Sequence, residues 1–275
     1  MDSARKVAVI TGAGRGIGRE FARVLAAEGW RLMLTAARNR EELDDAVAEI
    51  ATAHGADRVA GVLADAGAEA DAARTVAETL ARFGRLDGLV NNAGRGPREF
   101  SETFATDPPR FWEVPAEGWS ELIRSNVTGP FLMSKAAAPH LIAGGWGRIV
   151  NVTTSRVTMV RRGFAPYGPS KAALDAMTRI FAQDLDGMGV TVNVLAPGGA
   201  TDTAFIPGEG PNRTGADGNL LPVGIMNPAL RWLMSDASDG VTAARLIGAK
   251  WDETLPPAEA ARGAREDTGA PPLLL

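Results

Sequence analysis

The sequence predicts an α/β fold in which helices cover both faces of a parallel sheet of seven strands. Seven short runs rich in β-branched and aliphatic residues alternate with longer, alanine-rich segments whose apolar residues recur at helical spacing. No linker or internal repeat divides the chain, and its 275 residues, 45% of them hydrophobic, are enough to bury a sizeable core. Alternation of this kind is typical of a parallel sheet between two layers of helices.

The predicted elements follow in chain order. The strands cover residues 7–11, 32–35, 59–63, 86–90, 148–152, 190–195 and 246–249, and the helices cover residues 17–28, 41–53, 71–83, 119–142 and 166–185. In the second helix Leu43, Val47 and Ile50 share one face, and Gly55 follows where a helix would end. We expect one domain over residues 1–255 and a tail, residues 256–275, that is loosely ordered or lies on a neighbouring subunit.

Composition and charge exclude several classes of function. The net charge is −4 and the sequence pI about 5.4, without a basic stripe, so we expect no binding to nucleic acid. The absence of cysteine excludes disulfides, thiolate metal sites and cysteine nucleophiles, and it fits a reducing compartment. His54 and His140 lie far apart without ligand-like neighbours, so we expect no metal site. The first apolar run stops at Thr11, too early for a signal peptide or a membrane span, and we expect a cytoplasmic protein.

A glycine-rich turn joins the first strand to the first helix. It reads Thr11-Gly12-Ala13-Gly14-Arg15-Gly16-Ile17-Gly18, a Thr-Gly-x-x-x-Gly-x-Gly spacing rather than Gly-x-Gly-x-x-Gly. Such a turn lets the backbone approach a pyrophosphate, and the helix N-terminus adds N–H donors and a positive dipole. The alternative is a tight strand–helix turn without a ligand, and the position after the first strand favours the phosphate site.

Tyr167, the only tyrosine, and Lys171 lie one helical turn apart. Because Pro169 is tolerated only in the first turn of a helix, we expect the helix to begin near Pro166. The positive helix end and the ammonium group would then both lower the pKa of Tyr167, which is ~10 in free peptides. A phenol brought toward neutrality can exchange a proton with a carbonyl or alcohol oxygen. The alternative is an unrelated surface tyrosine and lysine.

Asn126 lies inside the predicted helix over residues 119–142, four residues before Pro130. Proline has no N–H to donate, so the carbonyl group of Asn126 is left free in mid-helix and needs a water molecule or a side chain. A simple kink and a water anchor beside an active site are both compatible with this pattern.

Two long segments lack periodicity, and they cover residues 95–115 and 198–227. Each follows a strand, and both strands should end at the same edge of the sheet. Long loops of this kind in a compact domain are usually functional or disordered. Aromatic side chains of the first segment and the loop over residues 205–221 predict an apolar pocket, although the aromatic residues would fit a buried packing patch as well. These aromatic residues are Phe100, Phe104, Phe111 and Trp112.

Taken together, the motifs resemble the single-domain short-chain dehydrogenases/reductases over residues 6–251. The matching features occur in the order of that family, and they are Thr11-Gly12-x-x-x-Gly16-x-Gly18, Asp65, Asn91-Asn92-Ala93-Gly94, Asn126, a hydroxyl after the fifth strand, Tyr167-x-x-x-Lys171 and Pro197-Gly198. The resemblance implies a three-layer, doubly wound Rossmann-type sheet of seven strands in the order 3-2-1-4-5-6-7, with the cofactor across the switch point.

The resemblance also implies roles for individual residues. Tyr167 would be the acid/base, Lys171 would hold the nicotinamide ribose, and Asn126 would anchor a proton-relay water. Asp65 would meet the adenine, Asn91 and Gly94 would pack near the adenosine ribose, and Pro197-Gly198 would border the nicotinamide. The full set of candidate cofactor-binding residues is Thr11, Gly12, Arg15, Gly16, Ile17, Gly18, Arg38, Asp65, Asn91, Ala93, Gly94, Tyr167, Lys171, Pro197, Gly198, Thr201 and Thr203.

The chain departs from the family in three places. The family's serine stands thirteen residues before the tyrosine, where this chain has Thr154, followed by Ser155. Side chains alternate along a strand, so register favours Thr154, whereas a bulge at the strand end would favour Ser155. The segment between Gly94 and Trp119 is longer than usual, and the usual glycine-rich ending is replaced by Gly248-Ala249-Lys250-Trp251-Asp252-Glu253.

The sequence favours NADP over NAD as cofactor. NAD enzymes of this fold place a carboxylate at the end of the second strand, whereas residues 35–40 contain none. Arg15 and Arg38 would bracket a 2′-phosphate instead.

We therefore expect an oxidoreductase that transfers a hydride between NADP(H) or NAD(H) and an apolar carbonyl or secondary alcohol. The expected assembly is a homodimer or homotetramer. The alternatives are an epimerase- or dehydratase-like relative that uses the same cofactor, and a catalytically silent NADP-binding sensor or interaction module.

Overall fold

The computed structural model describes residues 5–104, 106–208, 215 and 218–266. Its centre is a seven-stranded sheet in the order β3-β2-β1-β4-β5-β6-β7, and all six strand pairs are parallel. The strands are β1 (Val7–Ile10), β2 (Arg31–Ala36), β3 (Val59–Leu63), β4 (Gly88–Asn91), β5 (Gly147–Val152), β6 (Val190–Ala196) and β7 (Arg245–Ile247). The fold and strand order expected from the sequence are confirmed. The last strand ends earlier than expected, because Gly248–Lys250 form a short 3-10 turn.

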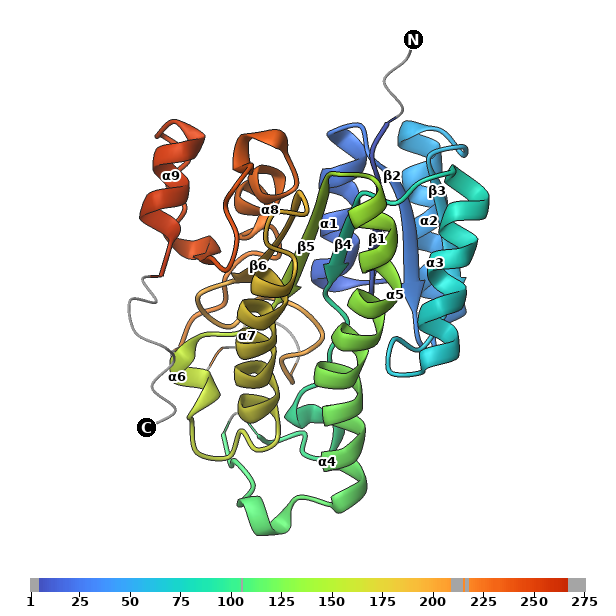
Figure 1. Ribbon diagram of the computed structural model, residues 1–275. Coiled ribbons are helices and arrows are strands. Elements are labelled where there is room, and N and C mark those ends of the chain that lie inside the picture. Colours follow the sequence, from blue (N-terminus) through green and yellow to red (C-terminus); the bar gives the residue numbers. More distant parts are fainter. Residues whose placement is uncertain (1–4, 105, 209–214, 216–217, 267–275) are drawn as a thin grey trace.

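Helices cover both faces of this sheet (Figure 1). The helices are α1 (Gly16–Ala27), α2 (Arg40–His54), α3 (Glu69–Phe83), α4 (Ala116–Ile123), α5 (Gly129–Ala143), α6 (Arg156–Met159), α7 (Tyr167–Asp184), α8 (Asn227–Leu233) and α9 (Pro257–Ala264). Successive residues of β1 belong to different cores: Ala8 packs with α1, α2 and α8, whereas Val9 packs with α3 and α5. The sheet is therefore buried on both sides, and its carboxyl edge is left for a ligand site.

The prediction of one continuous α-helix over residues 119–142 is wrong. The structure has α4, a π-helical segment Arg124–Thr128, and then α5 with Pro130 in its first turn. The break lies where Pro130 lacks the N–H that a continuous α-helix needs. The π-helical segment holds Asn126, whose side chain is fully buried.

The C-terminal tail also differs from the expectation. Pro257–Ala264 form α9, which packs on α8 and β7 of the same chain and buries Ala260, Ala261 and Ala264 (Figure 1). Just beyond α9, the Glu266 carboxylate accepts a hydrogen bond at 2.6 Å from Nε of Arg245, which is 2% exposed. Residues 256–266 thus pack on their own chain, while residues 267–275 of the expected tail lie outside the described part.

Replacing Glu266 by alanine should lower the free energy of unfolding by about 1–3 kcal/mol, because it leaves a donor of the buried Arg245 guanidinium unpaired. The matched control is Glu259→Ala, since Glu259 is exposed on α9 and engages no side chain within the described residues. Urea denaturation of both variants measures the difference. Equal stability of the two variants would show that the contact of Glu266 with Arg245 does not hold the tail.

None of the helices in the described part of the chain combines the length and the hydrophobicity that a membrane span requires.

Candidate active site

The turn after β1 is shaped for a phosphate group. Gly12 and Gly16 have positive φ angles of 66° and 55°, and a Cβ at Gly18 would lie 2.2 Å from the carbonyl oxygen of Gly12. Arg15, the residue that precedes α1, makes no side-chain cap, so the first N–H groups of this helix have no capping side chain. An uncapped helix N-terminus behind a glycine turn is a ready site for a phosphate anion.

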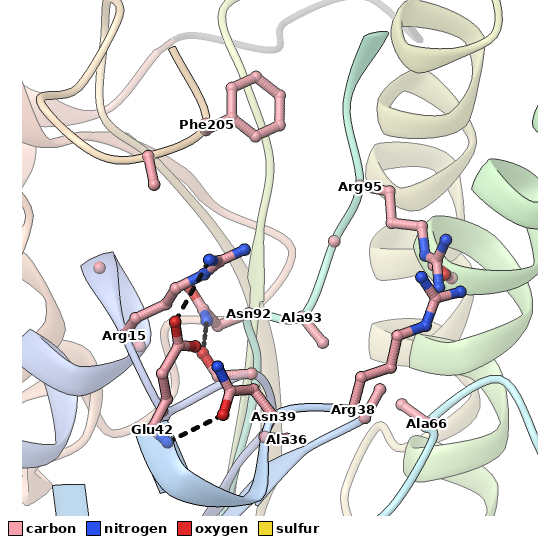
Figure 2. A pocket seen from close by; sticks show the side chains of 18 of the residues that line it. Arg15, Ala36, Arg38, Asn39, Glu42, Ala66, Asn92, Ala93, Arg95 and Phe205 are labelled. Carbon is pink, nitrogen blue, oxygen red and sulfur yellow. Dashed lines mark hydrogen bonds and ion pairs between the residues drawn. The ribbon is translucent and has the colours of Figure 1, made fainter. Parts of the chain in front are cut away.

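A cavity of about 760 Å³ extends from this turn along the carboxyl ends of β1 to β4 (Figure 2). Most of the predicted cofactor residues line it, namely Gly12, Arg15, Gly16, Ile17, Gly18, Arg38, Asp65, Ala93, Gly94 and Thr203. Thr11 and Asn91 are among the predicted residues that do not. Thr11 lies behind the turn, where its hydroxyl accepts hydrogen bonds from the N–H groups of Asn92 and Ala93. Asn91 is buried within the sheet and bonds the side chains of Asn151 and Ser134, so it links β4 to β5 and α5 instead of facing the cavity.

The end of β2 forms a charged rim on this cavity. Arg15 lies 3.4 Å from the Glu42 carboxylate, and Arg38 and Arg95 lie on the opposite side (Figure 2). Both of these arginines lie within 3.8 Å of the Glu121 carboxylate. Glu42 was not singled out in the sequence, because it follows the strand end by six residues. The Asn39 side chain caps α2 by accepting from the N–H of Glu42, and this first turn brings the carboxylate to the rim.

Asp65 lies on the cavity wall with its carboxylate already paired. It accepts hydrogen bonds from Arg124 at 2.6 Å and from the Gly67 N–H at 2.9 Å. Burial acts to raise the pKa of Asp65, but these hydrogen bonds outweigh it and hold the pKa below its usual value. A charged Asp65 therefore fixes the loop after β3 against the π-helical segment.

A second cavity of about 420 Å³ adjoins the first, and both are lined by Ile17, Asn92, Gly94, Thr203 and Phe205. Into it the carboxyl ends of β5 and β6 and the start of α7 bring Thr154, Ser155, Tyr167, Lys171, Pro197, Gly198 and Thr201. Tyr167 is the first residue of α7, as the position of Pro169 predicts. Its ring packs against Phe164 and Phe205, with centroids 6.3 and 5.4 Å away.

The two candidate hydroxyls have different surroundings. Thr154, 9% exposed, lies in the same cavity wall as Tyr167, close enough to the phenol to act on its pKa. Ser155 instead caps α6: its hydroxyl accepts from the N–H of Thr158 and lies 2.9 Å from the Thr158 hydroxyl. The geometry therefore favours Thr154 as the hydroxyl beside the tyrosine.

Burial dominates the electrostatics of the pair on α7. It raises the pKa of Tyr167 to about 12, against the opposing effect of the Thr154 side chain. The sequence led us to expect a lowered pKa; burial reverses the direction, and the Lys171 ammonium donates to the carbonyl oxygen of Val152 at 2.9 Å. Burial also lowers the pKa of Lys171 to about 8, with Asp175 opposing it.

Asn126 is part of the same cluster. Its side-chain amide accepts from the N–H of Arg95 at 2.8 Å and donates to the carbonyl oxygen of Arg95 and to the hydroxyl of Ser170. Gly94 fits between Asn126 and Lys171: an added Cβ would lie 3.2 Å from Oδ1 of Asn126 and 3.3 Å from Nζ of Lys171. Asn126 thus joins the π-helical segment to the loop after β4.

Comparison with known proteins identifies the family. A family model described as short chain dehydrogenase matches residues 6–211. The chain belongs to the short-chain dehydrogenase family. It is an NAD(P)-dependent oxidoreductase that acts on CH–OH and C=O groups, as its family implies.

Relatives of this short-chain dehydrogenase cover most of the chain. A short-chain type dehydrogenase/reductase of Picea abies is 32% identical over 86% of this chain and 89% of its own length. A 3-oxoacyl-(acyl-carrier-protein) reductase of Synechocystis sp. is 36% identical over 70% of this chain and 73% of its own length. Among solved structures, a dehydrogenase/reductase from Sinorhizobium meliloti aligns with a TM-score of 0.76 and 31% identity over 89% of this chain and 93% of its own. A 3-ketoacyl-(acyl-carrier-protein) reductase from Brucella melitensis, complexed with NADH, aligns with a TM-score of 0.73 and 28% identity, over 88% of this chain and 96% of its own.

The residues present fit the nicotinamide dinucleotide that this family binds. The uncapped start of α1 and the glycine turn suit its pyrophosphate, and the close approach of Gly18 to Gly12 leaves no room for a side chain in the turn. The two adjoining cavities let an extended molecule reach from the end of β2 to Tyr167. The described residues contain no cluster of three or more side chains suited to a metal ion.

Proposed function

We propose that this short-chain dehydrogenase interconverts an apolar ketone and a secondary alcohol, with Tyr167 as the general acid/base. The observation that carries the proposal is the second cavity, which Tyr167, Thr154 and Lys171 all line and which adjoins the cavity at the glycine turn. A phenol, a hydroxyl and an ammonium group in one buried cavity favour an enzyme over a silent sensor. The described chain holds no second domain of the kind that epimerase- or dehydratase-like relatives carry for their substrates.

Each residue of the site has a different role in the proposed reaction. Nicotinamide, when bound, would supply or accept the hydride. The Thr154 hydroxyl hydrogen-bonds the substrate oxygen, and the Tyr167 hydroxyl protonates that oxygen as negative charge develops on it. Because burial raises the pKa of Tyr167 to about 12, the phenol is protonated at neutral pH, the form that a reductase needs. The Lys171 ammonium lies one turn further along α7, where it would hold the nicotinamide ribose.

The proposed function is tested with a panel of aryl and alkyl ketones, each offered with NADPH and NADH, by following nicotinamide absorbance. Oxidation of the corresponding alcohols measures the reverse reaction. Absence of turnover with every member of the panel, despite cofactor binding, would favour the sensor.

We propose NADP as the preferred cofactor. Arg15 and Arg38, with side chains 69% and 68% exposed, lie on the rim of the cavity beside the end of β2. Their ion pairs, at 3.4 Å to Glu42 and 3.8 Å to Glu121, are long and open to solvent, so both can turn to a phosphate group.

Replacing Arg38 by alanine should weaken NADPH binding about tenfold and leave NADH binding nearly unchanged, because only NADPH carries the 2′-phosphate. Fluorescence titration with each cofactor measures both dissociation constants. Arg40→Ala is the matched control, since Arg40 begins α2, pairs with Asp44 and does not line the cavity. Tighter binding of NADH than of NADPH by the unaltered enzyme would contradict the preference.

A further inference from the structure

The cavity around Tyr167 contains a cationic side chain that the proposed reaction does not use. Among the described residues that line it, only Lys171 and Arg161 carry a charge, and both are positive. Lys171 already donates a hydrogen bond to the carbonyl oxygen of Val152, and the proposed reaction already gives it a role. Arg161 therefore adds a positive charge to an apolar, hydroxyl-bearing cavity whose described wall has no carboxylate.

Arg161 is held in place by its backbone and by one ring. Its N–H donates to the carbonyl oxygen of Thr158 at 3.3 Å, and its own carbonyl oxygen accepts from the N–H of Phe164 at 3.2 Å. The guanidinium carbon lies 5.6 Å from the centroid of the Phe164 ring. Within the described residues no carboxylate forms an ion pair with this guanidinium, whereas the nearby Arg156 is paired with Glu266.

A guanidinium that lies over an aromatic ring keeps the N–H groups on its edge available. These donors form a rigid fork that matches two oxygens of a carboxylate or a phosphate. In a partly buried cavity such a charge-assisted pair is stronger than on an open surface, because the surrounding medium screens it less. The arrangement suits an anionic group that enters with the ligand.

Phe164 connects this cation to the reacting end of the cavity. Its ring lies 6.3 Å from the Tyr167 ring on one side and 5.8 Å from the Phe104 ring, centroid to centroid. Phe164 thus neighbours both the Arg161 guanidinium and the Tyr167 ring, so a positive charge, an apolar surface and the proton donor adjoin one another in one cavity.

We propose that Arg161 binds the anionic group, a carboxylate or a phosphate monoester, of an oxo substrate whose apolar middle lies against Phe164 and Phe104. This assignment of a substrate class rests on the function proposed above. The substrate places its carbonyl oxygen at Tyr167 and Thr154 and its anionic end at Arg161.

The experiment compares charged and neutral ketones that are otherwise matched. Benzoylformate, benzoylpropionate and benzoylbutyrate are each assayed against their methyl esters, and phenacyl phosphate is assayed against phenacyl alcohol. The three acids differ in the spacing between carbonyl and carboxylate, and the phosphate distinguishes the two kinds of anion. The enzymes are the unaltered protein, Arg161→Gln, and the matched control Arg162→Gln, since Arg162 is exposed and does not line the cavity.

We expect the unaltered enzyme to favour at least one anionic ketone over its neutral partner by about tenfold or more in kcat/KM. Arg161→Gln should raise KM for that anion about 10- to 100-fold, with kcat and the neutral partner nearly unchanged. Arg162→Gln should behave like the unaltered enzyme. Equal losses on charged and neutral ketones, or no preference for any anion, would overturn the proposal.

A binding measurement separates this proposal from the proposed function. Phenylbutyrate has the apolar ring and the carboxylate but no carbonyl to reduce, and calorimetry gives its dissociation constant for the enzyme in the presence of cofactor. Arg161→Gln should weaken that binding about 10-fold or more. If phenylbutyrate binds through Arg161 but no ketone is turned over, the anion site stands and the proposed function fails. If neutral ketones are reduced but Arg161→Gln changes neither phenylbutyrate binding nor discrimination between acids and esters, the anion site fails and the function stands.

Discussion

Replacing Tyr167 by phenylalanine is expected to lower kcat at least about 100-fold, because the variant loses the proposed general acid/base, whose contribution is typically ~10²–10⁴-fold. The ring packs against Phe164 and Phe205, and phenylalanine keeps these contacts. Cofactor affinity and the thermal midpoint should therefore stay close to those of the unaltered enzyme. Steady-state kinetics, a cofactor titration and thermal denaturation measure the three properties.

The two readouts besides kcat make this test specific. A variant that loses turnover together with stability or cofactor affinity would point to a packing role for the tyrosine. If Tyr167→Phe keeps more than about a tenth of the unaltered rate, another group moves the proton, since a principal acid/base contributes more than that. Lys171 would then be the candidate, since it lines the same cavity and burial lowers its pKa to about 8, close to neutrality.

Much of the fold was predictable because the strands are buried on both faces. Runs such as Val7-Ala8-Val9-Ile10 have no polar face, which fits only a sheet covered on both sides. The helix α9 was missed for a different reason. Its apolar face consists of alanines between prolines and glycine, and this composition is also typical of a disordered tail. The packing of these alanines against α8 and the contact of Glu266 with Arg245 are long-range interactions that no local pattern reveals.

The site was predictable where a local motif sets the geometry. The glycine turn and the helix start at Tyr167 follow from steric rules that act within a few residues. The pKa of Tyr167 was not predictable from the sequence, because the burial of its ring depends on Phe164 and Phe205, which reach the ring from separate loops. Phe205 was expected to line the pocket only as part of the loop over residues 205–221, without a predicted contact. Its position follows from Gly96, where an added Cβ would lie 2.0 Å from the Phe205 ring.

The arrangement around Arg245 supports the choice between the two hydroxyls. Its guanidinium donates to the Thr153 hydroxyl at 2.9 Å, to the Asp175 carboxylate at 2.7 Å and to the carbonyl oxygen of Thr154. The backbone after β5 is thereby fixed from behind, with the Thr154 side chain toward Tyr167. A bulge that turned Ser155 inward would have to break these contacts and also the cap that Ser155 provides to α6.

Replacing Thr154 by valine is therefore expected to lower kcat/KM about 100-fold, because it removes the hydroxyl that would hydrogen-bond the substrate oxygen. Valine keeps the β-branched shape of threonine, so a side chain that is only 9% exposed is replaced with little change in volume. Ser155→Ala should leave kcat/KM within about threefold and cost about 1 kcal/mol of stability, as the loss of a helix cap does. The two variants are measured side by side with the same ketone and by urea denaturation. If Ser155→Ala shows the kinetic loss and Thr154→Val does not, the chain rearranges at the end of β5 when substrate binds. If neither variant loses activity, the Tyr167 hydroxyl holds the substrate oxygen alone, and Thr154 has no direct part in catalysis.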